Sequence, residues 1–270
     1  MGLSGRMELK QPTLEEIVDS ERSLVLGAEA RYGKYYLNAR ACSIFLSRSI
    51  VSVELSHHDT FGRFFSQLKK HHMLALLSTV RLHKVQSMMN LRQVLEASAA
   101  AAFAIANPEM QNFADTVANG LLDPSKALAK KRYEWLDKHF PEGSRAIKEK
   151  KELINDTTSH ANIVSANLTF SVDDKMTNVA APFFDIEDEF HVQVDLWLIS
   201  SIGVELMDLL YGVNLKRNAI EFVGNFQEYL HHVARQTAAL HAEITSTDRY
   251  KRAMAIAQRG AGEKSSPAAR

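Results

Sequence analysis

Apolar side chains recur at three- and four-residue spacing through most of this 270-residue sequence, and few helix breakers interrupt them. That spacing places apolar residues on one face of an α-helix. The chain has only 12 glycines and 6 prolines, which is few for the many turns of a β-sandwich or barrel. With 46% hydrophobic and 24% charged residues, its composition is that of a globular protein. The sequence therefore predicts an all-α fold, a multi-helix up-and-down bundle around a sizeable core.

The bounds of the expected helices follow from the apolar spacing and from capping residues or prolines at their starts. The start signals are Thr13 with Glu16, Asn107-Pro108, Asp123-Pro124, Asp185, and Asn218 with Glu221. The expected helices cover 13–30, 34–56, 60–85, 86–106, 123–139, 144–160, 185–212 and 218–244. Because the helix at 185–212 is apolar almost all round, we expect it to be central and nearly fully buried.

We expect one helical domain over 13–250, in which N-terminal helices over 13–85, forming a helical hairpin, precede a bundle over 86–245. The periodicity fails over 167–182, so a small non-helical insertion is expected there, the only place where a short hairpin is predicted. Residues 1–12 are expected to be flexible, and residues 259–270, rich in Gly, Ser, Pro and charge, to be disordered.

The charge balance and the single cysteine exclude several classes of protein. Lys plus Arg equals Asp plus Glu at 32 each, so binding to nucleic acid or a membrane surface would need a local patch. Cys42 alone forms no internal disulfide and no multi-cysteine zinc site, and its apolar surroundings indicate a buried thiol. The N-terminus lacks an apolar signal-peptide core, and the most apolar stretch, 192–211, is interrupted by three acids. We expect a cytoplasmic protein without a membrane span or cofactor.

Two polar constellations remain, because phosphate-loop and nucleophile-elbow motifs do not occur. Arg92 and Glu96 lie one turn apart on the alanine-rich helix predicted at 86–106. They must meet polar partners if that face is buried, whereas an exposed pair would contribute only ~0.3–0.5 kcal/mol. Asp156 and His160 are also one turn apart, the spacing at which a carboxylate can orient an imidazole. A solvated helix end would account for these polar residues equally well.

Three features together resemble the HEPN-like helical families found among prokaryotic toxins and defence proteins. They are the pattern Leu91-Arg92-x-x-x-Glu96-Ala97, a helical stretch with Tyr133 and Trp135, and a polar helix ending in Ser159-His160-Ala161. The resemblance spans roughly residues 85–170, and the helices at 185–245 would complete the bundle. It implies a HEPN-like fold, and a homodimer, since related proteins commonly pair.

In active HEPN ribonucleases a histidine assists attack by the ribose 2′-hydroxyl, and an arginine four to six intervening residues earlier stabilises charge on the phosphate. His160 matches that histidine and Asp156 matches the polar position after the arginine, but Asn155 stands where the arginine would be. The resemblance therefore implies a protein that binds RNA, a nucleotide, another anionic ligand or a protein partner without competent catalysis. The alternative is a metal-independent ribonuclease that uses His160.

The predicted site consists of Arg92, Glu96, Asn155, Asp156 and His160. In it Glu96 would hold Arg92, Asp156 would orient His160, and Arg92 with His160 would face a phosphate. This arrangement requires two helices that are far apart in the chain to converge.

A di-iron carboxylate bundle is a further alternative, because two Glu-x-x-His strings have the ligand spacing of such centres. They are Glu54 with His57 and Glu228 with His231. The composition alone yields about 0.8 such strings by chance, so two are unremarkable. No metal is therefore assigned in the leading interpretation.

Several other polar residues need partners if the bundle forms as predicted. His191, Asp195, Glu205 and Asp208 share the apolar helix at 185–212, and we expect at least one of these carboxylates to meet Arg92 or another cation. His72, on one stripe with Leu68 and Leu76, is expected to be partly buried and hydrogen-bonded.

Overall fold

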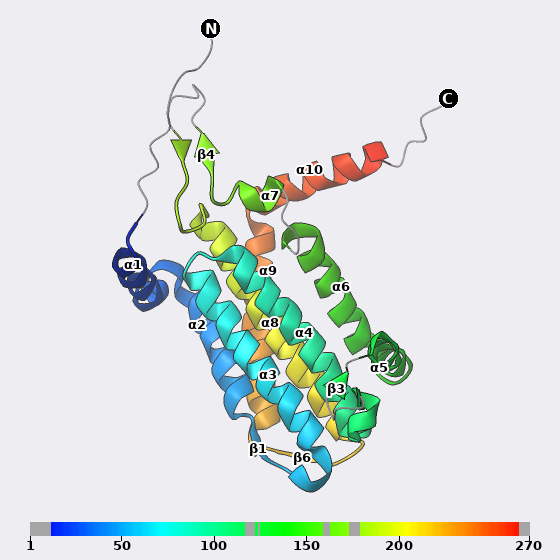
Figure 1. Cartoon of the computed structure of the whole chain (residues 1–270). Helices are drawn as coiled ribbons and strands as arrows, with labels where there is room; N and C mark the ends of the chain where they lie inside the picture. Colours follow the sequence, from blue (N-terminus) through cyan, green and yellow to red (C-terminus); the bar gives the residue numbers. More distant parts are fainter. Residues whose placement is uncertain (1–11, 117–121, 124, 159–162, 173–178, 265–270) are drawn as a thin grey trace, which may run out of the picture.

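The computed structural model describes residues 12–116, 122–123, 125–158, 163–172 and 179–264, with the side chains of 55–57, 116, 156–158, 164, 172, 179–180 and 257–264 left aside. It confirms the all-α expectation (Figure 1). The helices are α1 (Leu14–Leu26), α2 (Ala28–Arg48), α3 (Leu55–Val80), α4 (Lys84–Ala106), α5 (Lys126–His139), α6 (Pro141–Thr158), α7 (Ile163–Ala166), α8 (Glu189–Asn214), α9 (Phe226–Ser246) and α10 (Asp248–Lys264).

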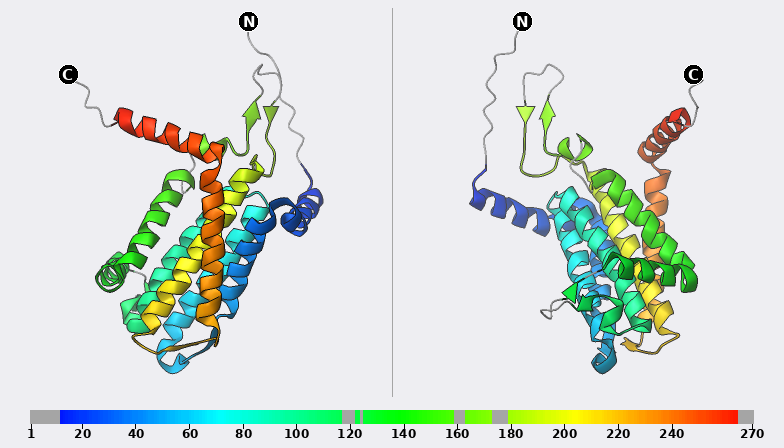
Figure 2. Two further views of the ribbon diagram at one scale, coloured as in Figure 1. Left: turned by 180° about the vertical axis from the view of Figure 1, so that it is seen from behind. Right: turned by 45° about the vertical axis from the view of Figure 1, so that its right-hand side comes forward.

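Helix α8 forms the centre of the bundle, as its all-round apolar sequence predicts. It packs against α2, α3, α4, α6 and α9, and Figure 2 shows it enclosed by these helices from two further sides. Among the described residues it is the one helix long and apolar enough to cross a membrane, but most of its apolar stretch is buried inside the bundle. Its composition is thus explained by its place in the core.

The N-terminal helices differ from the single helix expected over 13–30. The capping box is confirmed, because the Thr13 hydroxyl accepts from the Glu16 amide and the Glu16 carboxylate accepts from the Thr13 amide. The helix then breaks at Gly27. Helix α2 is kinked at Gly33, whose φ of +50° is a backbone conformation that residues with a side chain rarely adopt. In Figure 1, α1 projects to one side of the bundle.

A short antiparallel ladder contradicts two of the predicted helix bounds. Strand β1 (Ile50–Val53) pairs with β6 (Ile220–Phe222), so the helix predicted over 34–56 ends at Arg48 and α9 begins only at Phe226. Asn218, expected to start that helix, instead has a φ of +54°. The Asn214 side chain accepts from the amides of residues 219 and 220 and fixes this turn.

Two further hairpins have different outcomes. Strands β4 (Ser171–Val172) and β5 (Val179–Ala180) pair within the insertion predicted at 167–182. Strands β2 (Asp115–Thr116) and β3 (Leu122–Asp123) pair where none was expected. The Asn107-Pro108 start signal is wrong, since only a 3₁₀ turn at Met110–Asn112 follows it.

Three other bounds also shift. Ser125 caps α5 in place of Asp123, and Asp188 caps α8 in place of Asp185. Helix α10 extends to Lys264 through part of the segment predicted to be disordered, and residues 1–11 and 265–270 lie outside the described residues.

A tight contact at the centre of the core joins α2, α3 and α8. His72 is buried, donates from Nε2 to the Ile199 carbonyl at 3.1 Å and accepts from the Ser43 hydroxyl at 2.9 Å. Burial lowers the pKa of His72 to about 4 and raises that of the Cys42 thiol to about 12. Both side chains lie against Gly203. His72 and Cys42 are therefore structural core residues, as predicted.

Candidate functional site

The two helices that carry the predicted site pack against each other. Helices α4 and α6 run antiparallel and lie side by side (Figure 1), and α6 also contacts α8. On α4, Arg92 Nε donates to Glu96 Oε1 at 3.3 Å. From α6, Lys151 Nζ reaches the same Glu96 oxygen at 3.2 Å. The predicted Arg92–Glu96 pair is thus present, and a second cation from another helix joins it.

Helix α5 adds two more residues to this group. Lys151 Nζ donates to the Tyr133 hydroxyl at 3.2 Å and lies 5.1 Å from the centre of that ring. Arg132 lies over the Phe113 ring at 5.8 Å. Burial lowers the pKa of the Arg132 guanidinium, and the negative charge of Glu96 acts in the opposite direction. We call Arg92, Glu96, Arg132, Tyr133 and Lys151 the cationic cluster.

The cationic cluster holds more positive than negative charge among the described side chains. Arg92 and Lys151 both contact the single carboxylate of Glu96, and its charge also acts on the guanidinium of Arg132. The side chains of Arg92 and Glu96 are 38% and 39% exposed, and that of Lys151 is 21% exposed. The group is therefore open enough to meet a ligand, yet screened by water less than a fully exposed pair would be. In a chain with no net charge, this is the kind of local patch that anion binding requires.

The remaining predicted residues continue along α6. Asn155 is half-buried one turn beyond Lys151, on the same face. Lys151 on α6 contacts Glu96 on α4, and the two helices run in opposite directions. One turn forward along α6, at Asn155, therefore corresponds to one turn back along α4, at Arg92. Asp156 belongs to α6, but its side chain lies outside the described residues, and so does the whole of His160.

The alternative metal ligands do not gather in the bundle core. Glu228 and His231 are exposed on α9, whose buried face is formed by residues such as Leu230 and Val233. Glu54 is exposed before α3, and the His57 side chain lies outside the described residues. Among the residues described, no group of three or more His, Cys, Asp or Glu side chains could hold a metal ion. A di-iron centre needs inward-facing ligands from several helices, so we do not propose one.

Two acids of α8, Asp195 and Glu205, pair with cations from other helices, as expected, but neither cation is Arg92. Lys84 Nζ lies 2.9 Å from Asp195 and 2.7 Å from Glu187, whose side chains are only 8% and 3% exposed. The backbone amide of Lys84 donates to Asp185. Elsewhere on α8, Glu205 accepts from Lys150 and from the Ser201 hydroxyl.

We call Lys84, Asp185, Glu187 and Asp195 the Lys84 cluster. Burial and neighbouring charges shift the pKa values of three of these residues. Burial raises the pKa of Asp195 to about 6, although Lys84 acts to lower it. Burial also raises the pKa of Asp185. For Lys84 itself, burial disfavours the ammonium, but the carboxylates of Asp195 and Glu187 prevail and raise its pKa. The cluster ties the α3–α4 turn to the start of α8, which is a structural role.

Sequence reasoning missed Lys151 and Arg132. Lys151 lies between Ile147 and Ile154 on the buried stripe of α6, and a lysine within an apolar stripe signals a partner on the neighbouring helix. Arg132 precedes Tyr133, which the resemblance had singled out, and its approach to Glu96 depends on how α5 folds back.

Comparison with known proteins adds no further evidence: no protein family, no curated protein and no solved structure matches the chain.

Proposed function

We propose that this protein binds single-stranded RNA through its phosphates at the cationic cluster and does not cleave it. The observation that carries the proposal is the unbalanced charge of that cluster: Arg92 and Lys151 from two helices contact the one carboxylate of Glu96, and Arg132 from a third helix adds another positive charge. Arginine and lysine donors on phosphate oxygens form charge-assisted hydrogen bonds. Tyr133 provides an aromatic ring beside them, and a base would stack on the ring face that Lys151 does not cover.

The chemistry of the site favours binding over cleavage. Asn155 can donate a hydrogen bond to a phosphate but cannot neutralise the negative charge that builds on it during cleavage, so this position is suited to holding a phosphate and not to stabilising the transition state. The HEPN-like resemblance also supports binding without cleavage, because Asn155 stands where active members have the arginine that precedes the histidine. A protein of this kind would sequester or recognise RNA.

Fluorescence anisotropy with a labelled single-stranded RNA tests the proposal. Arg92→Gln and Lys151→Gln should each weaken binding about tenfold, because each removes one charge-assisted contact. Lys130→Gln is the matched control: Lys130 lies on α5, which carries Arg132 and Tyr133, but it is 79% exposed and pairs with Glu134. Equal affinity in the two site variants and the control would refute RNA binding at the cationic cluster.

The same samples distinguish the other functions. RNA cleavage in the presence of a chelator that disappears in His160→Ala would establish the metal-independent ribonuclease instead. Binding of a free nucleotide but not of RNA would restrict the ligand to small phosphates. If neither binds, a protein partner becomes the leading alternative.

We further propose a homodimer on the basis of the same resemblance. Light scattering coupled to gel filtration measures the mass of the particle in solution. A mass near 60 kDa, twice the 30.3 kDa of one chain, is expected, and a mass of one chain would contradict the dimer.

A further inference from the structure

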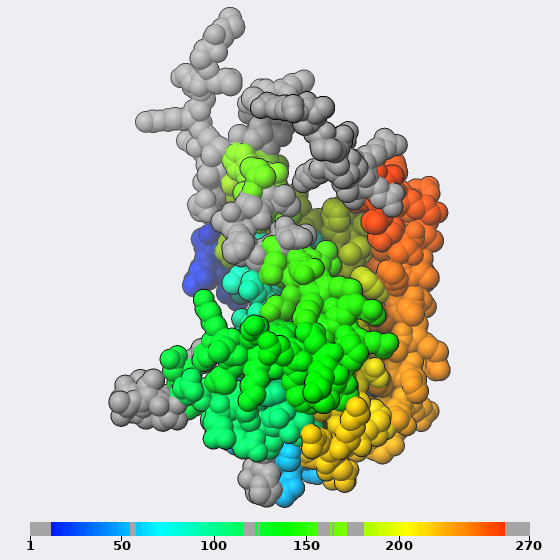
Figure 3. Space-filling view, turned by 90° about the vertical axis from the view of Figure 1, so that its right-hand side faces the viewer, coloured from blue at the N-terminus to red at the C-terminus, as the bar shows by residue number. Residues whose placement is uncertain are grey.

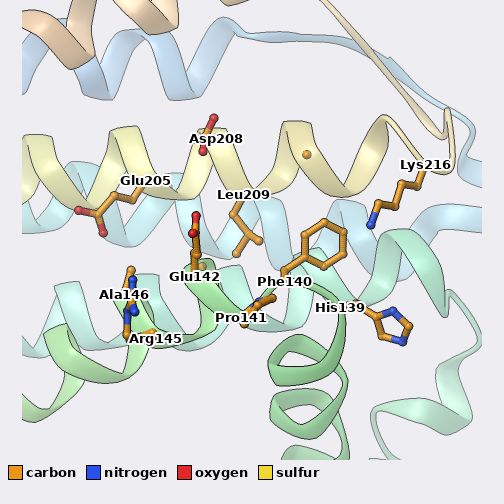
Figure 4. A pocket seen from close by; sticks show the side chains of 12 residues that line it. His139, Phe140, Pro141, Glu142, Arg145, Ala146, Glu205, Asp208, Leu209 and Lys216 are labelled. Carbon is orange, nitrogen blue, oxygen red and sulfur yellow. The ribbon is translucent and has the colours of Figure 1, made fainter.

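A second site candidate lies on the other side of α6, away from the cationic cluster. A pocket of about 570 Å³ opens between the α5–α6 junction and the C-terminal part of α8 (Figure 4). That volume is within the usual range for small-molecule sites, ~300–1,000 Å³. Figure 3 shows this face of the molecule, with α8 in yellow beside α6 in green. Its lining residues are His139, Phe140, Pro141, Glu142, Gly143, Arg145, Ala146, Glu205, Asp208, Leu209, Gly212 and Lys216.

Gly212 borders this pocket at a position where the helix leaves open space. It lies inside α8, where glycine is less favourable than alanine, and it does not have a positive φ that would require glycine. A Cβ atom added at Gly212 would meet no atom within 4 Å. Packing therefore does not require glycine either. The absent side chain leaves room in the pocket. At the opposite wall, a Cβ on Gly143 would come within 2.8 Å of Leu209, so the two helices are in close contact there.

The charges of the pocket are separated along α8. In Figure 4, Glu142 and Asp208 lie toward one end, Lys216 and His139 lie toward the other, and Phe140 with Leu209 lies between them. Among the described residues, Glu142, Asp208 and Lys216 form no ion pair. Lys216 Nζ instead lies 4.6 Å from the centre of the Phe140 ring.

The other charged lining residues already have partners. Lys150 neutralises Glu205, and Arg145 pairs with Glu149. What remains available to a ligand is an acidic end, an apolar middle and a basic end. Asp208 and Lys216 are eight residues apart on α8 and the turn that follows it, which corresponds to ~12 Å along a helix axis.

From this arrangement we infer that the pocket binds a small zwitterion with an apolar middle. Its ammonium group lies at Glu142 and Asp208, its carboxylate lies at Lys216 and His139, and its hydrocarbon part packs on Phe140 and Leu209. Ion pairs at both ends, combined with burial of the apolar segment, select this class over simple amines or simple acids. The inference is independent of RNA binding, because no residue of the cationic cluster lines this pocket.

Titration calorimetry with straight-chain amino acids tests the inference. The probes are 6-aminohexanoate and 8-aminooctanoate, and hexylamine and hexanoate each present only one of the two charges. At least one of the amino acids should bind, and at least tenfold more tightly than either single-charge probe. Absence of binding by both amino acids, or equal binding of the single-charge probes, would overturn the inference.

A matched pair of variants locates the binding. Gly212→Ala adds only the Cβ, so it should fold and keep the affinity for the amino acid. Gly212→Leu fills the space above the helix and should reduce that affinity at least tenfold, while circular dichroism shows the same helix content. Lys216→Ala should weaken binding of the amino acid but leave the binding of hexylamine unchanged. Undiminished binding in Gly212→Leu would show that the ligand lies elsewhere and would refute the assignment.

Discussion

Asp195→Asn tests whether the Lys84 cluster holds more negative charge than it can neutralise. The substitution keeps the size of the side chain and an oxygen that can accept from Lys84 Nζ, which lies 2.9 Å from Asp195 Oδ2. Lys84 also keeps its other partner, Glu187, at 2.7 Å. The variant therefore removes one of three carboxylates without leaving the ammonium unpaired.

The magnitude follows from the pKa of Asp195. Burial raises that pKa from 3.8 to about 6, and each tenfold change in proton affinity is ~1.4 kcal/mol, so ionising Asp195 costs the folded state about 3 kcal/mol. Because the folded pKa is above the unfolded one, this contribution to stability is complete below about pH 4 and is lost as the pH rises through about 6. Asparagine does not titrate, so Asp195→Asn is free of this loss.

Urea unfolding between about pH 4 and about pH 7.5 measures the effect. The free energy of unfolding of the variant, relative to the native sequence, should rise by about 2–3 kcal/mol across this range. Asp208→Asn, at an exposed position of the same helix, is the control and should show no such trend. Parallel pH curves for Asp195→Asn and the native protein would refute the reasoning, as would a variant that becomes relatively less stable toward high pH.

Three further predictions concern the core and α8. Gly203→Ala should destabilise the fold by about 1–3 kcal/mol in chemical denaturation, because the new Cβ would lie 2.4 Å from Cys42 Sγ and 2.8 Å from His72 Nε2. A normal denaturation midpoint would contradict that crowding. Cys42, whose burial raises the thiol pKa to about 12, should react with alkylating reagents only as fast as the protein opens, so rapid labelling of the native protein would argue against a closed core. Gly212→Ala should raise the free energy of unfolding by about 0.5–1 kcal/mol, since the added methyl group enters open space in a helix, and a loss of stability would show that the site is not open.

The helices were predictable because their signals are local. Apolar spacing predicted α4 within two residues at its start, and the capping box of Thr13 marked the beginning of α1. The uniformly apolar sequence of α8 predicted its central place, since such a helix can bury its whole surface only inside a bundle.

Strands β1 and β6 were missed because their pairing depends on residues that are far apart in the chain, whereas the local pattern at 167–182 did indicate the β4–β5 hairpin. Residues 50–53 continue the apolar spacing of α2, and only pairing with 220–222, about 170 positions later, makes them a strand. Asp185 shows the same limitation. It resembles a helix cap, but it accepts from the backbone of Lys84, and Asp188 caps α8 instead.

The candidate site was predictable in part. The i, i+4 spacing identified Arg92 and Glu96 as neighbours on one helix. Lys151 and Arg132 could not be assigned to the same group, because their approach to Glu96 depends on how α5 and α6 fold back over α4. Partner choice across helices depends on tertiary packing, which local spacing does not specify.

The salt dependence of RNA affinity tests the central claim most directly. Each cation that neutralises a phosphate of a single strand contributes ~0.7 to the slope of the logarithm of affinity against the logarithm of salt concentration. If Arg92 and Lys151 both contact phosphates, the double variant Arg92→Gln with Lys151→Gln should have a slope shallower by about 1.4 than that of the native protein. Equal slopes for the two proteins would contradict phosphate binding by the cationic cluster.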